Sequence, residues 1–249
     1  KNININEVKE KIIETCYKIL IFFIGEPPST ISWEFYDKKN NYNKTIEKIT
    51  PQEFYKKFVP YNVNNKVLLI NYPCKKYYNL YNVDMTFRID NNKENYINVP
   101  KEIMISAIEK SIKNNEAIYI GVDWDKYISQ NHGFLDQNGF NYNDVFGFNN
   151  DMSKCDNLKY RSSSPNHAIL IKGFNKKNKK YEFLIENSHG ELSGKKGDYY
   201  MSEDWFRDYV YRINIDKKYL PNNVKNVLNK QSITLPFTDP FGSLLYNSF

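Results

Sequence analysis

Two strand-like runs joined by a polar loop stand out in the hydrophobic pattern of the chain. Residues 167–174 are rich in branched apolar side chains, and residues 181–187 contain three apolar residues in succession. The loop between the runs, residues 175–180, contains no apolar residue. Two such runs around a short polar loop predict an antiparallel hairpin.

The predicted hairpin brings His167 close to Asn187 at one of its ends. Neighbouring strands lie about 5 Å apart, so the two side chains are within reach of each other. A symmetric register would point them to opposite faces, so their contact requires a bulge or a register offset. An amide oxygen that accepts a ring N–H would orient an imidazole as a general base. The alternative is a His and an Asn that only satisfy hydrogen bonds at a strand end.

The remaining pattern predicts helices followed by a sheet, which is an α+β fold. Helices are expected at residues 6–24, from Pro51 after the cap Thr50, from Pro100, after the cap Ser202, and at 221–228. Strands are expected at residues 31–36, 67–70, 80–87, 117–122, 199–201 and 210–215. Loops are expected at residues 37–48, 90–98 and 123–164, and an extended tail at 231–249. We therefore expect a mainly helical part with insertions (1–116), a β-barrel-like domain with His167 and Asn187 (117–216), and a C-terminal helix and arm (217–249).

Composition narrows the class of protein. The chain has 249 residues, of which 41% are hydrophobic, enough for a sizeable core. The net charge of +6 is dispersed, so a nucleic-acid surface is only a weak alternative. No stretch is long enough for a membrane span. Three cysteines without paired spacing argue against a disulfide and for a reducing compartment. No metal-ligand spacing or phosphate loop appears, so neither a metal nor a cofactor is expected.

Short blocks of sequence are distributed over nearly the whole chain. They are Asn166-His167-Ala168, Glu186-Asn187-Ser188 with Gly190-Glu191, and residues 25–28, 33–35, 50–55, 196–201, 203–211 and 239–242. In order and spacing they resemble the bleomycin hydrolase and aminopeptidase C family, a branch of the papain-like cysteine peptidases. The resemblance implies the C-terminal portion of a papain-like fold, with His167 as catalytic base and Asn187 as the residue that orients it.

Two departures from the family pattern concern this site. The family's nucleophile lies in a Gln-x-Gly-x-Cys-Trp context, and Cys16, Cys74 and Cys155 all lack it. We expect that an N-terminal segment outside this chain carries that Cys. The family also has Trp after Asn-Ser, where it shields the His–Asn hydrogen bond, whereas this chain has His189. We therefore expect the bond to be less protected here.

The resemblance also implies properties of the intact protein. It would be a cytoplasmic homohexamer that removes N-terminal residues from peptides, and its C-terminal arm, ending here at Phe249, would lie in the cleft and meet the substrate's free amine. The alternatives are a frayed C-terminus and a non-catalytic homologue that acts as a binding, assembly or nucleic-acid-binding subunit. His132 lies in the long loop at 123–164, and we expect a surface position for it rather than a catalytic one.

Overall fold

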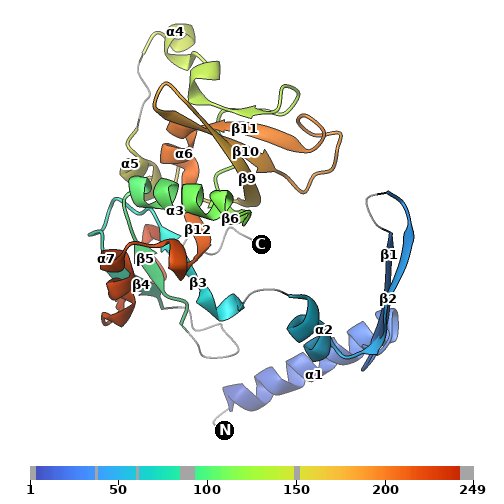
Figure 1. The fold of residues 1–249 in the computed structure, drawn as a ribbon. Helices are drawn as coiled ribbons and strands as arrows, with labels where there is room; N and C mark the ends of the chain where they lie inside the picture. The colour runs from blue at the N-terminus through green and yellow to red at the C-terminus, as the bar shows by residue number, and fades with distance from the viewer. Residues whose placement is uncertain (1–3, 37–38, 60–61, 85–92, 149–151, 242–249) are drawn as a thin grey trace. The chain divides into compact units, whose positions relative to one another are not determined.

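The fold is described from a computed structural model of the chain, for residues 4–36, 39–59, 62–84, 93–148 and 152–241. The chain divides into two compact units, Lys1–Asn62 and Val63–Phe249 (Figure 1). The three-part division at residues 116 and 216 stays a prediction, to which the structure adds a boundary after residue 62.

The first unit contains two helices and a two-stranded antiparallel hairpin. Its elements are α1 (Ile5–Ile24), β1 (Ile31–Tyr36), β2 (Tyr42–Ile49) and α2 (Pro51–Phe58). The expected cap of α2 is present, because Thr50 and Glu53 form a capping box. The expectation of a loop at residues 37–48 was wrong over β2. Residues 37 and 38 lie outside the described part, but β2 pairs along β1, so pairing of the backbones forms a strand that the polar sequence of residues 37–48 did not indicate.

The second unit is built on one mixed sheet. Its described strands are β3 (Lys66–Ile70), β4 (Asn79–Val83), β5 (Tyr96–Asn98), β6 (Ile118–Val122), β7 (Ile128–Ser129), β8 (Phe134–Leu135), β9 (His167–Lys177), β10 (Lys180–Glu186), β11 (Asp198–Ser202), β12 (Val210–Asp216) and β13 (Ile233–Leu235). They lie in the order β13-β4-β5-β3-β12-β6-β9-β10-β11-β8-β7. The centre, from β3 to β11, is antiparallel, whereas the pairs β3–β5, β4–β13 and β8–β11 are parallel.

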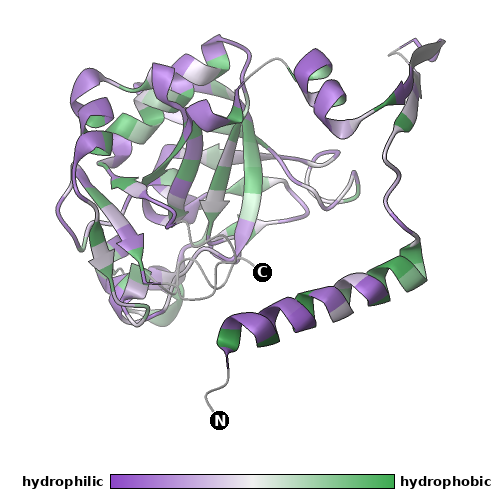
Figure 2. Cartoon of the chain, turned by 90° about the horizontal axis from the view of Figure 1, so that it is seen from below, coloured by the Kyte–Doolittle hydropathy of each residue, from purple (hydrophilic) through white to green (hydrophobic). Residues whose placement is uncertain are grey.

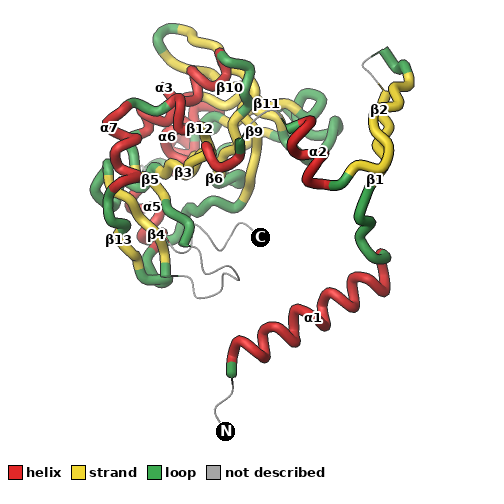
Figure 3. Tube along the Cα trace, turned by 60° about the horizontal axis from the view of Figure 1, so that its bottom comes forward, coloured by secondary structure: helices red, strands yellow, loops and turns green. Residues whose placement is uncertain are grey.

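Helices and short turns complete this unit. They are α3 (Lys101–Lys113), α4 (Tyr142–Phe146), α5 (Lys154–Lys159), α6 (Glu203–Tyr209) and α7 (Asn222–Lys225), with 3-10 turns at Val63–Asn65, Gln137–Gly139, Lys217–Tyr219 and Asn226–Asn229. Figure 3 shows α3 and α6 beside the strands of the sheet. The expected strand beginning at residue 80 ends at Val83, and residues 85–87 lie outside the described part.

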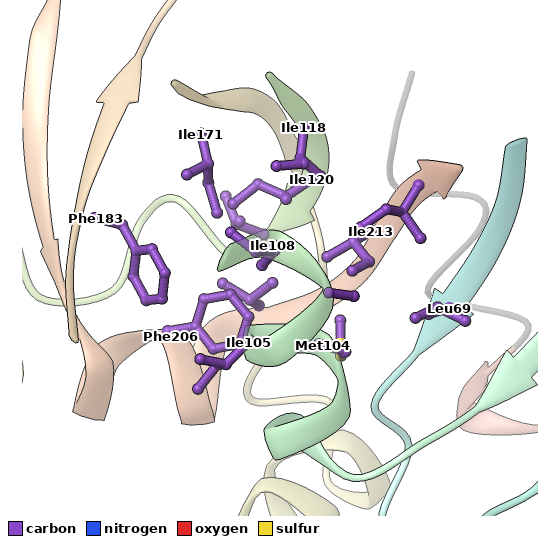
Figure 4. Close-up of a cluster of buried hydrophobic side chains, with 14 of the residues drawn as sticks. Leu69, Met104, Ile105, Ile108, Ile118, Ile120, Ile171, Phe183, Phe206 and Ile213 are labelled. Atoms are coloured by element: carbon purple, nitrogen blue, oxygen red, sulfur yellow. The ribbon is translucent and has the colours of Figure 1, made fainter. Parts of the chain in front are cut away.

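The core lies where α3 and α6 meet the sheet. Ile108 of α3, Phe206 of α6, and Ile171 and Ile213 of the sheet are buried together (Figure 4). The strands of this unit carry many of its hydrophobic residues, as the green colouring in Figure 2 shows. Each fully buried aliphatic side chain contributes roughly 1.5–3 kcal/mol of transfer free energy, so this cluster stabilises the sheet that carries His167.

Two expectations about the second unit were wrong. Residues 90–98 were expected as a polar loop, but their last three residues form β5, which is buried between β3 and β4. The two apolar residues Tyr96 and Ile97 are too few to reveal a strand by periodicity, and pairing on both sides holds them. Cys74 and Cys155 form a disulfide, with Cα atoms 5.2 Å apart, although their separation of 81 residues gave no sign of it.

The long segment at 123–164 is fixed by a buried lysine as well as by this disulfide. Lys154 Nζ donates hydrogen bonds to Asn71 Oδ1 at 3.0 Å and to the carbonyl oxygens of Arg207 and Val210 at 3.1 and 2.6 Å. Burial lowers the pKa of Lys154 to about 7. The described residues of the segment, 123–148 and 152–164, contain short helices and strands, whereas its Gly- and Asn-rich sequence suggested an irregular loop.

Candidate active site

The hairpin β9–β10 forms as expected, but with a tighter turn. The strands extend into the polar stretch as far as Lys177 and from Lys180, which leaves a two-residue turn instead of the six-residue loop at 175–180. Asn178 and Lys179 both have positive φ, 51° and 66°, as a type I′ hairpin turn requires.

A bulge in β9 supplies the register offset that the site requires. Leu184 pairs with Gly173, but the next residue, Ile185, pairs with Ile171, so Lys172 is an extra residue in β9. Beyond the bulge, residues of the same parity face each other across the two strands. His167 and Asn187 therefore lie on the same face of the hairpin, as diagonal neighbours.

The expected contact between the two side chains is present. His167 Nε2 lies 2.8 Å from Asn187 Oδ1. An amide oxygen only accepts hydrogen bonds, so Nε2 carries the proton and, in the neutral ring, Nδ1 is left with a lone pair. Asn187 is buried, its N–H donates to the Gly197 carbonyl at 3.0 Å, and its Oδ1 also accepts the N–H of Ser188 at 3.0 Å. The amide that orients His167 is thus itself fixed.

A polar network holds the residue that precedes His167. Asp123 accepts hydrogen bonds from Ser163 Oγ at 2.6 Å and from Asn166 Nδ2 at 3.2 Å. Asn166 Oδ1 accepts the backbone N–H of Trp124 at 2.8 Å. Burial raises the pKa of Asp123 above its ordinary value, and the hydrogen bond from Ser163 opposes this shift. The network joins the end of β6 to the start of β9.

Two aromatic rings lie beside the His167 imidazole. The ring centroids of Trp124 and His189 each lie 5.0 Å from that of His167, and they lie 6.3 Å from each other. Trp124 also contacts Tyr199 at 5.0 Å. Neither Asp123 nor Trp124 was predicted from the sequence to belong to the site. The only signal was their position directly after the predicted strand that ends at Val122, which pairs with His167.

The other candidate residues lie elsewhere or outside the described part. His132 is exposed, as expected, and its Nδ1 lies 2.8 Å from Ser129 Oγ. Cys16 is exposed on α1 of the first unit, and the other two cysteines form the disulfide. Phe249 lies outside the described residues.

The described residues form a pocket away from His167 and Asn187. A pocket of about 880 Å³ is lined by Tyr127, Phe140, Tyr142 and Arg207 among others, and neither His167 nor Asn187 lines it. No helix in the described segments is long and apolar enough to cross a membrane. In the same segments, no three His, Cys, Asp or Glu side chains are grouped so that they could hold a metal ion.

Comparison with known proteins identifies the class of this fold. The model of the Peptidase C1-like family matches residues 1–242. The crystal structure of PepW from Lactobacillus rhamnosis HN001 superposes with a TM-score of 0.87 at 30% identity, over 97% of this chain and 56% of that one. The α+β, papain-like fold expected from the sequence is confirmed. The chain belongs to the Peptidase C1-like family.

The similar curated proteins are peptidases of one branch. The chain is 37% identical to bleomycin hydrolase of Gallus gallus over 245 residues, which is 94% of this chain and 54% of that protein. It is 32% identical to aminopeptidase C of Listeria monocytogenes over 241 residues, 95% of this chain and 54% of that protein. The suspected resemblance is confirmed, and the chain spans about half the length of these relatives.

The hydrogen bond of His167 can be tested through its pKa. In Asn187→Asp, a carboxylate next to Nε2 favours the charged imidazolium, so we expect the pKa of His167 to rise by about 1–2 units. The change is measured in chain 1–249 by NMR pH titration of the His167 ring. Asn175→Asp is the matched control. Asn175 lies on β9, eight residues from His167, so its charge lies beyond the screening length of about 8–10 Å. Equal titration in both variants would contradict the contact.

Proposed function

We propose that this chain supplies the general base and its orienting amide to a papain-like cysteine aminopeptidase. The observation that carries the proposal is the hydrogen bond from His167 Nε2 to Asn187 Oδ1. It occupies the nitrogen on one side of the ring and leaves Nδ1 as the proton acceptor, which is the arrangement of a Cys-His-Asn site. The family to which the chain belongs and its similarity to bleomycin hydrolase and aminopeptidase C support this function.

In the proposed reaction, His167 moves a single proton. Nδ1 takes it from a cysteine thiol on a segment that precedes this chain, and the thiolate attacks the peptide carbonyl. The imidazolium then donates the proton to the leaving amine. Asn187 keeps the ring oriented through both transfers without adding a charge. The same hydrogen bond from Nε2 therefore orients the neutral and the protonated forms of His167.

The proposal includes further features of the intact protein, for which the resemblance is the support. Its substrates would be peptides, it would assemble as a homohexamer, and it would reside in the cytoplasm. The cytoplasmic location now depends on the resemblance alone, because the Cys74–Cys155 disulfide removes the argument from unpaired cysteines.

We propose that the C-terminal arm restricts hydrolysis to the N-terminal end of a peptide. Its described part is anchored on the second unit: Asp239 accepts a hydrogen bond from Tyr72 at 2.7 Å and forms an ion pair with Lys75 at 3.1 Å. Phe241 is buried against Tyr72 and Tyr96. These contacts favour a directed arm over a frayed terminus as far as residue 241. A terminal carboxylate carried by that arm would select the free amine of a peptide.

The proposed role of His167 predicts the activity of two forms of the protein. Chain 1–249 should not hydrolyse aminoacyl-coumarin substrates, whereas the protein with its preceding segment should. In that longer protein, His167→Ala should lower kcat by roughly 10²–10⁴-fold, the usual contribution of a general base. His132→Ala is the matched control and should leave kcat unchanged. A longer protein without thiol-dependent activity would instead support the non-catalytic alternative.

The arm predicts a change in specificity. Deleting residues 244–249 from the longer protein keeps the anchor at Asp239 and Phe241 and moves the terminal carboxylate back to Ser243, so that under the proposal it would no longer reach the substrate. We expect peptides with a blocked amino terminus to become substrates, while free-amine peptides are still hydrolysed. The two substrate types are compared by kcat/KM. If peptides with a blocked amino terminus stay uncut in an otherwise active variant, the arm does not determine the aminopeptidase specificity.

A further inference from the structure

The ring that covers His167 comes from a strand end far away in sequence. Trp124 follows β6, and its indole centroid lies 5.0 Å from that of His167 at an interplanar angle of 54°. The indole is almost fully buried, with 5% of the residue exposed, whereas His189 next to it is exposed. Trp124 therefore lies against the imidazole as a buried ring, whereas His189 lies against it as an exposed one.

Trp124 is also held in place from two sides. Its backbone N–H donates to Asn166 Oδ1, one residue before His167. Its ring packs edge-on against Tyr199, which is fully buried on β11. An indole restrained in this way cannot turn away from the imidazole without disrupting the core around Tyr199.

The rings of Trp124 and His189 lie on adjacent sides of the His167 imidazole. Trp124 and His189 each lie 5.0 Å from His167, but only 6.3 Å from each other. Rings on opposite sides of the imidazole would lie about twice the single contact distance apart, so these two rings cover adjacent parts of it. A larger ring at position 189 that turned towards the imidazole would therefore meet the indole.

We propose that Trp124 is a positioning residue that keeps water away from the hydrogen bond between His167 and Asn187. A second donor or acceptor from water weakens such a bond, and an apolar ring that excludes water strengthens it. The small ring of His189 is coupled to this role, because it leaves room for the indole. The site accommodates one large ring, at position 124 or at position 189. We call this exclusion of water by Trp124 the shield. Its importance for catalysis rests on the proposed function, whereas its existence does not depend on that function.

The test measures how fast the Nε2 proton of His167 exchanges with water in chain 1–249, by NMR at a pH where the ring is neutral. Trp124→Val should accelerate exchange by about fivefold, the factor that corresponds to a hydrogen bond of typical net strength. Trp124→Phe should have a smaller effect, because it retains an aromatic cover. The double variant Trp124→Val/His189→Trp should return towards the wild-type rate. Phe183→Val, a truncation of a buried ring without a ring contact to His167, is the matched control and should leave the rate unchanged.

Either of two results would overturn the proposal: an unchanged rate in a folded Trp124→Val chain, or equal acceleration in Phe183→Val. If Trp124→Val does not fold, the comparison of Trp124→Phe with wild type decides, and equal rates reject the shield. Activity of the longer protein separates this inference from the proposed function. With the exchange results as expected, a longer protein without peptidase activity would reject the function and leave the shield intact.

Discussion

The position of His167 depends on the double pairing of β9. One edge of this strand pairs with β6, where Val122 lies opposite His167, and the other edge pairs with β10. The extra residue Lys172 shifts the pairing of β9 with β10 by one residue on the His167 side of the bulge. His167 and Asn187 therefore share a face of the hairpin. A bulge leaves a residue unpaired and interrupts the ladder. In this chain its consequence is the hydrogen bond on which the candidate site is built.

The site is organised around His167 by elements that lie close to it only after folding. Asn187 orients the ring from β10, Trp124 covers it from the end of β6, and Asp123 holds Asn166 immediately before it. A base arranged in this way before its nucleophile arrives loses little orientational freedom in the reaction. In the described residues, the imidazole is therefore oriented by contacts within this chain.

The sequence predicted the parts of this site that are local. The hairpin, the pairing of His167 with Asn187 and the need for a register offset all follow from the spacing of two apolar runs around a polar loop. The turn was expected to be longer than it is, because the polarity of residues 175–180 does not show that a strand continues through exposed positions. Strand β5 and the Cys74–Cys155 disulfide were missed, since partners distant in sequence hold them. The contact between Trp124 and His167 was missed for the same reason, and only the fold reveals it.

The central claim, that His167 is the base for a cysteine thiol, is tested most directly by the reactivity of that thiol. In the protein with its preceding segment, the rate of alkylation by iodoacetamide is measured against pH, with Cys16→Ser to remove the exposed thiol of α1. A thiol paired with His167 should react as a thiolate well below the ordinary cysteine pKa of about 8.5, and His167→Ala should return its profile to that value. The claim is contradicted if no cysteine reacts below its ordinary pKa, or if the acid-shifted profile survives in His167→Ala.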